Sequence, residues 1–170
     1  MLRLLAVPLA AVAFHASAQP LSVPVRNELI AAGVWHKGCP VPLSQLRVLS
    51  VTYWGFDGRP HPGQFVTNET AVAPLSTVFQ RLYQLRFPIR HLSIDDAYGL
   101  AIDLNPRENP YVGCGQSRDP TAVSYMNRSR LRKGMITPAV LEAFHSVGWG
   151  WGGSWTGDTK DYMHFSSTGH

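Results

Sequence analysis

Hydrophobic positions recur with helical spacing in three parts of the chain. The segment "VAPLSTVFQRLYQLRFP" predicts an amphipathic helix that Pro88 closes. Its apolar face would carry Val72, Leu75, Val78, Phe79, Leu82 and Leu85. The segment "MITPAVLEAFHSVGW" predicts another helix, with Thr137 as N-cap, Pro138 at the first helical position and Gly148 after the end. Residues 25–35 predict a third helix, which Gly38 ends.

Other segments show the alternation that is typical of strands. Residues 46–68 predict a hairpin around a turn rich in Gly, Asp and Pro, and strands are expected in residues 87–94, 99–106 and 162–166. In the segment "GLAIDLNP", alternation directs Leu100, Ile102 and Leu104 to one face and Ala101 and Asp103 to the other. Helices and antiparallel strands without a βαβ rhythm indicate an α+β fold, a small antiparallel sheet with flanking helices.

The first 18 residues have the pattern of a secretory signal peptide. Arg3 is followed by an apolar run over residues 4–14 and by the small residues Ala16, Ser17 and Ala18, so cleavage is expected after Ala18. The apolar run is too short to span a bilayer, and no later segment resembles a membrane span. We therefore expect an exported protein, periplasmic or extracellular, with one domain over residues 19–170.

Composition restricts the class of partner. Removal of Arg3 with the leader lowers the formal net charge from +4 to +3, and the chain lacks the Lys/Arg clusters of a nucleic-acid binder. This mild charge suits an anionic bacterial wall, but equally well simple solubility. The two cysteines, Cys39 and Cys114, suggest a disulfide in an oxidising compartment. Such a bridge would constrain the unfolded chain by about 4 kcal/mol.

Three polar residues are candidates for chemistry. In "DYMHF", Asp161 precedes His164 by three positions. A metallohydrolase needs a neutral imidazole on its metal and a nearby carboxylate that takes a proton from bound water. Positions three apart on a straight strand face opposite ways, so Asp161 should lie on a bend, which residues 157–160 could provide. Asp103, preceded by the small residues Gly99 and Ala101 at alternate positions, is either a third member of the site or a turn carboxylate before Asn105.

The ordered combination of "AYGLAIDLNPRENPYV", "NRSRLRKGMITPAVLEAFHSVGWGWGGSW" and "KDYMHF" resembles the zinc peptidases of the D-alanyl-D-alanine carboxypeptidase family, which include VanY-type and L-alanyl-D-glutamate peptidases. The resemblance extends from about Leu29 to Ser166. It implies a hedgehog/DD-peptidase-like fold and substrates among the D-amino-acid-containing peptides of peptidoglycan. A monomer is expected.

The resemblance also implies roles for individual residues. Asp103 matches the aspartate zinc ligand of the family motif H-x-x-G-x-A-x-D, His164 matches the late histidine ligand, and Asp161 matches the general base. Trp155, within the segment "WGWGGSW", matches the cleft wall, although core packing is an equally good role for these tryptophans. Arg90 could bind a substrate carboxylate or remain a solvated strand residue.

The chain departs from the family pattern at the first histidine ligand. Aligned on Gly99, that ligand falls on Asp96, and the sequence has no counterpart of the long family loop that usually ends in Ser-x-His. In relatives this loop tends to hold a cysteine, which weakens the case for pairing Cys39 with Cys114. Asp96 could itself bind zinc, since carboxylate oxygens ligate this metal at similar distances. His91 is a weaker candidate for the vacant position.

Two functions therefore stay open. The first is an exported zinc carboxypeptidase or endopeptidase that acts on peptidoglycan peptides, with weakened catalysis. The second is a catalytically inactive, metal-free relative that only binds cell-wall peptides. A set of two carboxylates and one imidazole neutralises the charge of zinc, and so lowers the pKa of bound water less than a set with two histidines.

Overall fold

The named strands form antiparallel sheets in the computed structural model, which describes residues 13–94, 98–117 and 119–170, and an isolated parallel bridge joins Trp54 to Pro88. The first sheet has the order β1 (Ala16–Pro20), β2 (Leu46–Trp54), β3 (Pro60–Asn68). The second has the order β4 (Leu92–Ile94), β5 (Ala101–Leu104), β9 (His164–Ser166), β7 (Gly150–Trp151). Strands β6 (Tyr111–Val112) and β8 (Lys160–Asp161) form a small third sheet. The α+β prediction is confirmed.

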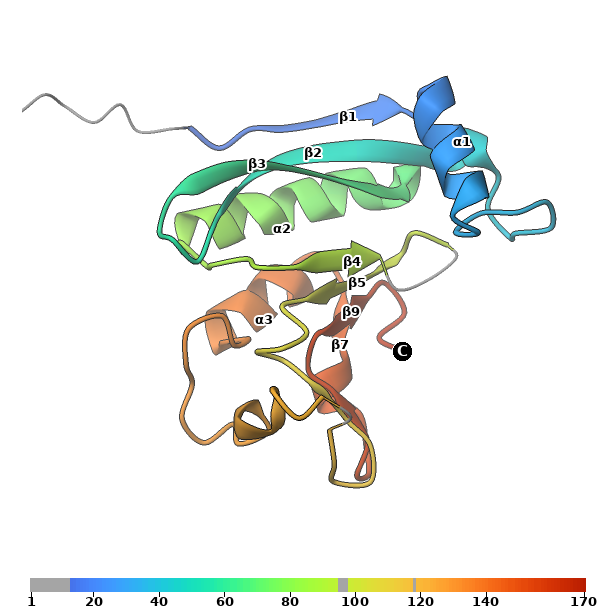
Figure 1. Cartoon of the computed structure of the whole chain (residues 1–170). Helices are drawn as coiled ribbons and strands as arrows, with labels where there is room; N and C mark the ends of the chain where they lie inside the picture. Colours follow the sequence, from blue (N-terminus) through green and yellow to red (C-terminus); the bar gives the residue numbers. More distant parts are fainter. Residues whose placement is uncertain (1–12, 95–97, 118) are drawn as a thin grey trace, which may run out of the picture.

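The helices pack between and beside these sheets. Helix α1 (Val23–Ala31) lies at one end of the first sheet, α2 (Val72–Gln84) lies along that sheet, and α3 (Pro138–His145) lies beside the second sheet (Figure 1). Four apolar residues of α2 are buried, namely Leu75, Val78, Phe79 and Leu82. Leu85, which the pattern placed on the same face, is 47% exposed because the helix has already ended at Gln84.

The capping signals of α3 are confirmed. Thr137 has extended backbone angles, and its hydroxyl accepts a hydrogen bond from the backbone N–H of Val140 at 3.4 Å. Pro138 is the first helical residue, where its missing N–H leaves no hydrogen bond unmade. Gly148 follows the helix with a φ of +81°, in the left-handed region that glycine adopts at low cost. This part of the fold therefore follows from local sequence.

The strand predicted over residues 87–94 is shorter than expected. Only β4 is paired as a strand, opposite β5. Pro88 has no N–H for a ladder, and the N–H of Ile89 instead donates to the carbonyl of Trp54 at the end of β2, at 2.8 Å. The beginning of this segment thus joins the first sheet to the second. The predicted hairpin is confirmed as β2 and β3.

The predicted leader cleavage site lies within a folded strand. Residues 1–12 lie outside the described part of the chain, but Ala16 pairs with Val51 and Pro20 pairs with Arg47 in the β1–β2 ladder. The ring of Phe14 lies 5.7 Å from that of Tyr83. Cleavage after Ala18 stays a prediction. Among the described residues, none of the helices combines the length and apolar character needed to cross a bilayer.

The suggested disulfide is wrong for the described fold, in which both cysteines are free. Cys39 lies in the loop between α1 and β2, where its sulfur accepts a hydrogen bond from the N–H of His36 at 3.3 Å. Cys114 is exposed in a tight turn after β6, with a φ of +51°. The two thiols belong to separate loops on different sheets.

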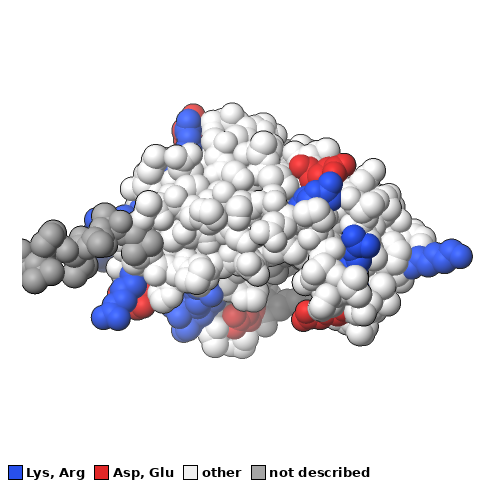
Figure 2. Space-filling view, turned by 90° about the horizontal axis from the view of Figure 1, so that it is seen from above, with Lys and Arg blue, Asp and Glu red and all other residues white. Residues whose placement is uncertain are grey.

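On the face shown in Figure 2, charged side chains of both signs are scattered among uncharged ones.

The main core joins α2, α3 and both larger sheets. Its centre includes the stacked rings of Phe144 on α3 and Phe165 on β9, with centroids 3.7 Å apart and planes inclined by 12°. Both side chains are fully buried. Phe165 directly follows His164, so this core contact also fixes the backbone beside a predicted site residue.

We expect Phe144→Ala to lower the free energy of unfolding by about 3–5 kcal/mol, because it leaves a cavity against Phe165. Val123→Ala serves as the control, since Val123 is 52% exposed, and should change this free energy by less than about 0.5 kcal/mol. Urea unfolding measures both values. A loss as small in Phe144→Ala as in the control would contradict the packing described.

Candidate functional site

The two predicted ligands Asp103 and His164 lie opposite each other on neighbouring strands. They are direct partners in the β5–β9 register, so their side chains project from the same face of the sheet. Asp103 is 7% exposed and His164 is 6% exposed. The Nδ1 atom of His164 lies 3.5 Å from Oδ1 of Asp103. Residues 61 positions apart in the sequence are thus brought together, as the motifs predicted.

The separation of these two atoms suits a shared cation better than a direct hydrogen bond. It exceeds the usual donor–acceptor distance of about 2.7–3.2 Å. Two donors bound to one tetrahedral zinc at about 2.0–2.1 Å would lie about 3.3–3.4 Å apart. In addition, Oδ1 of Asp103 is buried without a hydrogen-bond partner in the described part of the chain. On both counts this pair fits two ligands of a zinc site.

The predicted general base, Asp161, is buried. It lies three residues before His164 in the sequence but belongs to a different sheet. It ends β8, where it pairs with Tyr111 of β6, and it is 8% exposed. A bend at residues 162–163 separates Asp161 from β9. The sequence predicted this bend at residues 157–160. Gly152 makes this placement possible, because a Cβ there would lie 2.5 Å from the carbonyl oxygen of Asp161.

The structure explains why the first position of the G-x-A-x-D motif, Gly99, is a glycine. Gly99 has a φ of +69°, and a Cβ on it would lie 2.7 Å from the backbone nitrogen of Asn68. Its carbonyl accepts hydrogen bonds from the N–H of Asn68 at 3.0 Å and from the hydroxyl of Thr67 at 2.8 Å. The end of β3 therefore holds the chain just before it enters β5, and only glycine allows so close an approach.

The tryptophans near the site divide into two groups. The ring of Trp155 lies 5.6 Å from that of His164, and its indole N–H donates to the carbonyl of Gly169 at 2.7 Å. It can therefore form a wall beside the histidine. Trp149 is 3% exposed and belongs to the main core, as the alternative interpretation held.

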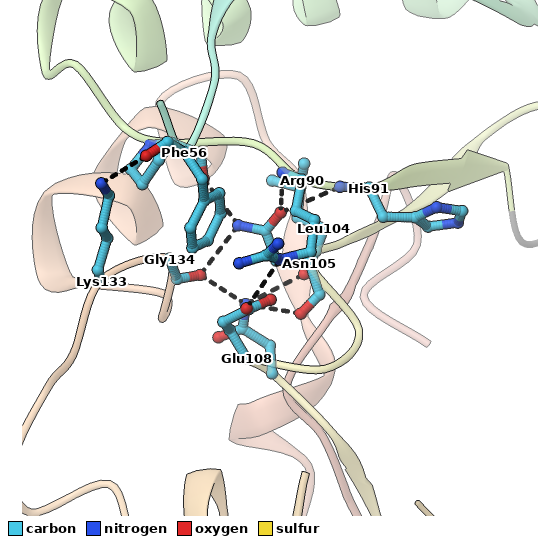
Figure 3. Close-up of polar contacts among 10 residues, drawn as sticks. Phe56, Arg90, His91, Leu104, Asn105, Glu108, Lys133 and Gly134 are labelled. Carbon is cyan, nitrogen blue, oxygen red and sulfur yellow. Dashed lines mark hydrogen bonds and ion pairs between the residues drawn. The ribbon is translucent and has the colours of Figure 1, made fainter. Parts of the chain in front are cut away.

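Arg90 is already paired in the structure. Its Nε lies 3.1 Å from Oε1 of Glu108, and its guanidinium lies 4.0 Å above the ring of Phe56 (Figure 3). Glu108 is only 1% exposed, so this ion pair compensates a buried carboxylate. The Arg90 side chain is nevertheless 48% exposed, and a role in substrate binding stays a prediction.

Asp96, the predicted substitute for the first histidine ligand, lies outside the described residues. His91 is exposed on the approach to β4, and its side chain extends away from Asn105 in Figure 3. Within residues 13–94, 98–117 and 119–170, no group of three or more His, Cys, Asp or Glu side chains is placed to hold a metal ion. The described residues therefore provide two ligands of the predicted site.

Sequence reasoning missed a buried polar network behind the site. Asn105 and Asn109 are 0% exposed and bind several backbone groups, and Arg128 joins them. The only signal in the sequence is the repeated Asn-Pro in "DLNPRENP", which indicated a turn. Burial lowers the pKa of the Arg128 guanidinium, while the neighbouring Tyr162 opposes this shift. The group nevertheless stays charged, since arginine titrates far above neutral pH.

Comparison with known proteins agrees with this geometry. A family model described as D-alanyl-D-alanine carboxypeptidase matches residues 95–167. Over residues 95–167, the chain is thus similar to the D-alanyl-D-alanine carboxypeptidases. The matched residues contain Asp103, Asp161 and His164, and the family resemblance that the motifs predicted is confirmed there. For residues 29–94 the carboxypeptidase resemblance stays a prediction. No curated protein and no solved structure gives a significant match to the chain.

Gly152→Ala should displace Asp161, because the added methyl group overlaps its backbone and its Cβ. We expect a loss of about 1–3 kcal/mol in the free energy of unfolding, which is typical of overpacking at a buried site. Ser167→Ala, at an exposed position just after β9, is the control and should have little effect. Thermal or urea unfolding checks both, and an unchanged stability in Gly152→Ala would refute the close approach.

Proposed function

We propose that this protein is an exported zinc metallopeptidase that hydrolyses D-amino-acid-containing peptides of peptidoglycan, as a carboxypeptidase or an endopeptidase. The observation that carries the proposal is the Asp103–His164 pair, buried and 3.5 Å apart inside the region that matches the carboxypeptidase family. The family match supports the reaction class and the peptide substrate. Export, zinc binding and the choice of peptide bond are part of the proposal.

The residues of the chain would divide the work as follows. Asp103 and His164 would hold zinc, which when bound polarises a carbonyl group and acidifies water. Asp161 would accept the proton of the attacking water and return it to the leaving amine. Trp155 would exclude water beside His164, and the half-exposed Arg90 would attract the substrate carboxylate.

The third protein ligand in this proposal is Asp96. A carboxylate can take the place of the family histidine, since both bind zinc at about 2.0–2.2 Å. It brings a second negative charge to the site, however, so bound water would be less acidic than in a site with two histidines. We therefore expect slower hydrolysis than the complete ligand set would give.

One observation favours a second candidate function. At the position of the first family histidine the chain carries Asp96, and catalytic zinc sites usually take three protein ligands. A metal-free relative could keep the fold and bind cell-wall peptides without cleaving them. The two candidates differ in a simple property, the zinc content of the purified protein.

Under the first candidate, purified protein should contain about one zinc per chain and should release D-alanine or cleave a muropeptide. Asp161→Asn should keep the zinc and lower kcat by about 10²–10⁴-fold, because it removes the proton acceptor. Asp158→Asn, at an exposed position three residues earlier, is the matched control and should retain activity. Metal analysis and amino-acid release measure these quantities. Purified protein that contains no zinc and has no activity, but still binds muropeptide, would instead support the second candidate.

Asp96→His should increase zinc affinity at least tenfold, because it restores the imidazole of the family motif and removes one negative charge from the proposed ligand set. Competition with a chromophoric chelator measures the affinity. Asp95→His is the control for a histidine introduced one position away. An affinity unchanged by Asp96→His would show that this position does not reach the ion, and that the missing family loop matters more than the residue type.

A further inference from the structure

Two fully buried asparagines lie two and six residues after the predicted ligand Asp103. Asn105 and Asn109 are both 0% exposed, so each amide must pair its donors and acceptors inside the protein. We propose that Asn105 and Asn109 are positioning residues that keep the Asp103–His164 pair at the separation a zinc ion requires. This inference rests on the proposed function and identifies residues outside the expected ligand set.

Asn105 ties β5 to the approach to β4. Its side-chain oxygen accepts hydrogen bonds from the backbone N–H groups of Arg90 at 2.7 Å and His91 at 3.3 Å. Its amide nitrogen donates to the carbonyls of Pro88 at 2.8 Å and Gly134 at 3.0 Å (Figure 3). Its φ of +48° turns the chain sharply, a conformation that asparagine tolerates better than most residues. The end of β5 is thereby fixed next to β4.

Asn109 holds the same strand end from the other side. Its amide nitrogen donates to the carbonyls of Leu104 at 3.1 Å, Asn105 at 3.3 Å and Gly134 at 3.0 Å. Its side-chain oxygen accepts the N–H of Ile136 at 2.8 Å. The carbonyl of Gly134 is thus shared by both asparagines, which makes the two amides one unit.

Arg128 links the two asparagines to Tyr162, in the bend between Asp161 and His164. Both terminal nitrogens of this guanidinium donate to the side-chain oxygen of Asn109, each at 3.2 Å. The guanidinium also lies 4.7 Å above the ring of Tyr162, the residue that follows Asp161. The carbonyl of Tyr162 accepts the indole N–H of Trp151 at 2.9 Å, which fixes this bend from its far side.

These contacts close into a ring around the site. The N–H of Leu104 donates to the carbonyl of Met163 at 3.0 Å, so the residue after one ligand is bonded to the residue before the other. Asn109 binds the carbonyl of the same Leu104 and, through Arg128, reaches Tyr162. The ring therefore couples the position of Asp103 to that of His164 without using the side chain of either ligand.

The test compares the same isosteric substitution in two environments. In Asn109→Asp, a carboxylate oxygen replaces the donor that serves three carbonyls, so the ring should open. In the control, Asn127→Asp, only the side-chain oxygen is used, since it accepts the N–H and hydroxyl of Ser129, and a carboxylate accepts them equally well. Both variants add the same charge.

We expect Asn109→Asp to lower zinc affinity and kcat by about 10–100-fold at a temperature where it is folded, with KM changed less, whereas Asn127→Asp stays near the wild type. The visible spectrum of the cobalt-substituted protein should change in Asn109→Asp alone. Amide hydrogen exchange adds a metal-free measurement. The N–H of Leu104 should exchange at least tenfold faster relative to that of Phe79, a buried residue of α2, because the opening is local.

Two results together would overturn the proposal. Folded Asn109→Asp would bind zinc with the affinity of the wild type, and the ratio of the amide exchange rates of Leu104 and Phe79 would be the same in the variant as in the wild type. If the wild type binds no zinc, the proposed function fails on its own, and the exchange ratio alone decides on the positioning role. Should Asn109→Asp not fold, Arg128→Gln opens the ring at its other side by removing the paired donors. The same two criteria then apply to that variant.

Discussion

The pairing of β5 with β9 is the contact on which the rest of the site depends. Asp103 and His164 share one face of this pair, and Ile102 and Phe165 share the opposite face. A slip of one residue would turn either strand over and separate the two ligands. Phe165 is stacked on Phe144 of α3, so such a slip would also expose a large apolar side chain. The hydrophobic core therefore selects the register that brings the polar pair together.

The burial of Asp103 and His164 has an energetic cost that hydrophobic packing does not offset. A carboxylate and an imidazole below 10% exposure are costly to bury unless charge or hydrogen bonds compensate them. Elsewhere the fold provides this compensation from its own side chains, as where Arg90 pairs with the buried Glu108. Between Asp103 and His164 the separation is longer than a good hydrogen bond and matches the distance between two donors on one ion. A bound cation would offset the cost of burying Oδ1 of Asp103, which has no hydrogen-bond partner in the described part of the chain.

Local signals in the sequence predicted much of this arrangement. Thr137, Pro138 and Gly148 delimit α3 through the hydrogen-bonding needs of helix ends, and the alternation around Asp103 predicted β5. The motif order predicted that Asp103 and His164 would meet, although they are distant in the chain. The roles of Asn105 and Asn109 could not be predicted, because their partners at Pro88, Gly134 and Ile136 are set by tertiary packing. The disulfide suggestion failed for a related reason, since an even number of cysteines says nothing of their spatial separation.

The predicted departure from the carboxypeptidase motif falls between β4 and β5, and the described residues on either side of it make defined contacts. Before it, Ile94 pairs with Ile102, and Ser93 lies directly opposite Asp103. After it, the carbonyl of Tyr98 accepts the side-chain amide of Asn68, and the carbonyl of Gly99 is bound by the end of β3. Absence of the long family loop, which the sequence predicts, would therefore change the ligand set while leaving the two-strand base of the site intact. That base is determined by the core and, as we propose, by the buried asparagines.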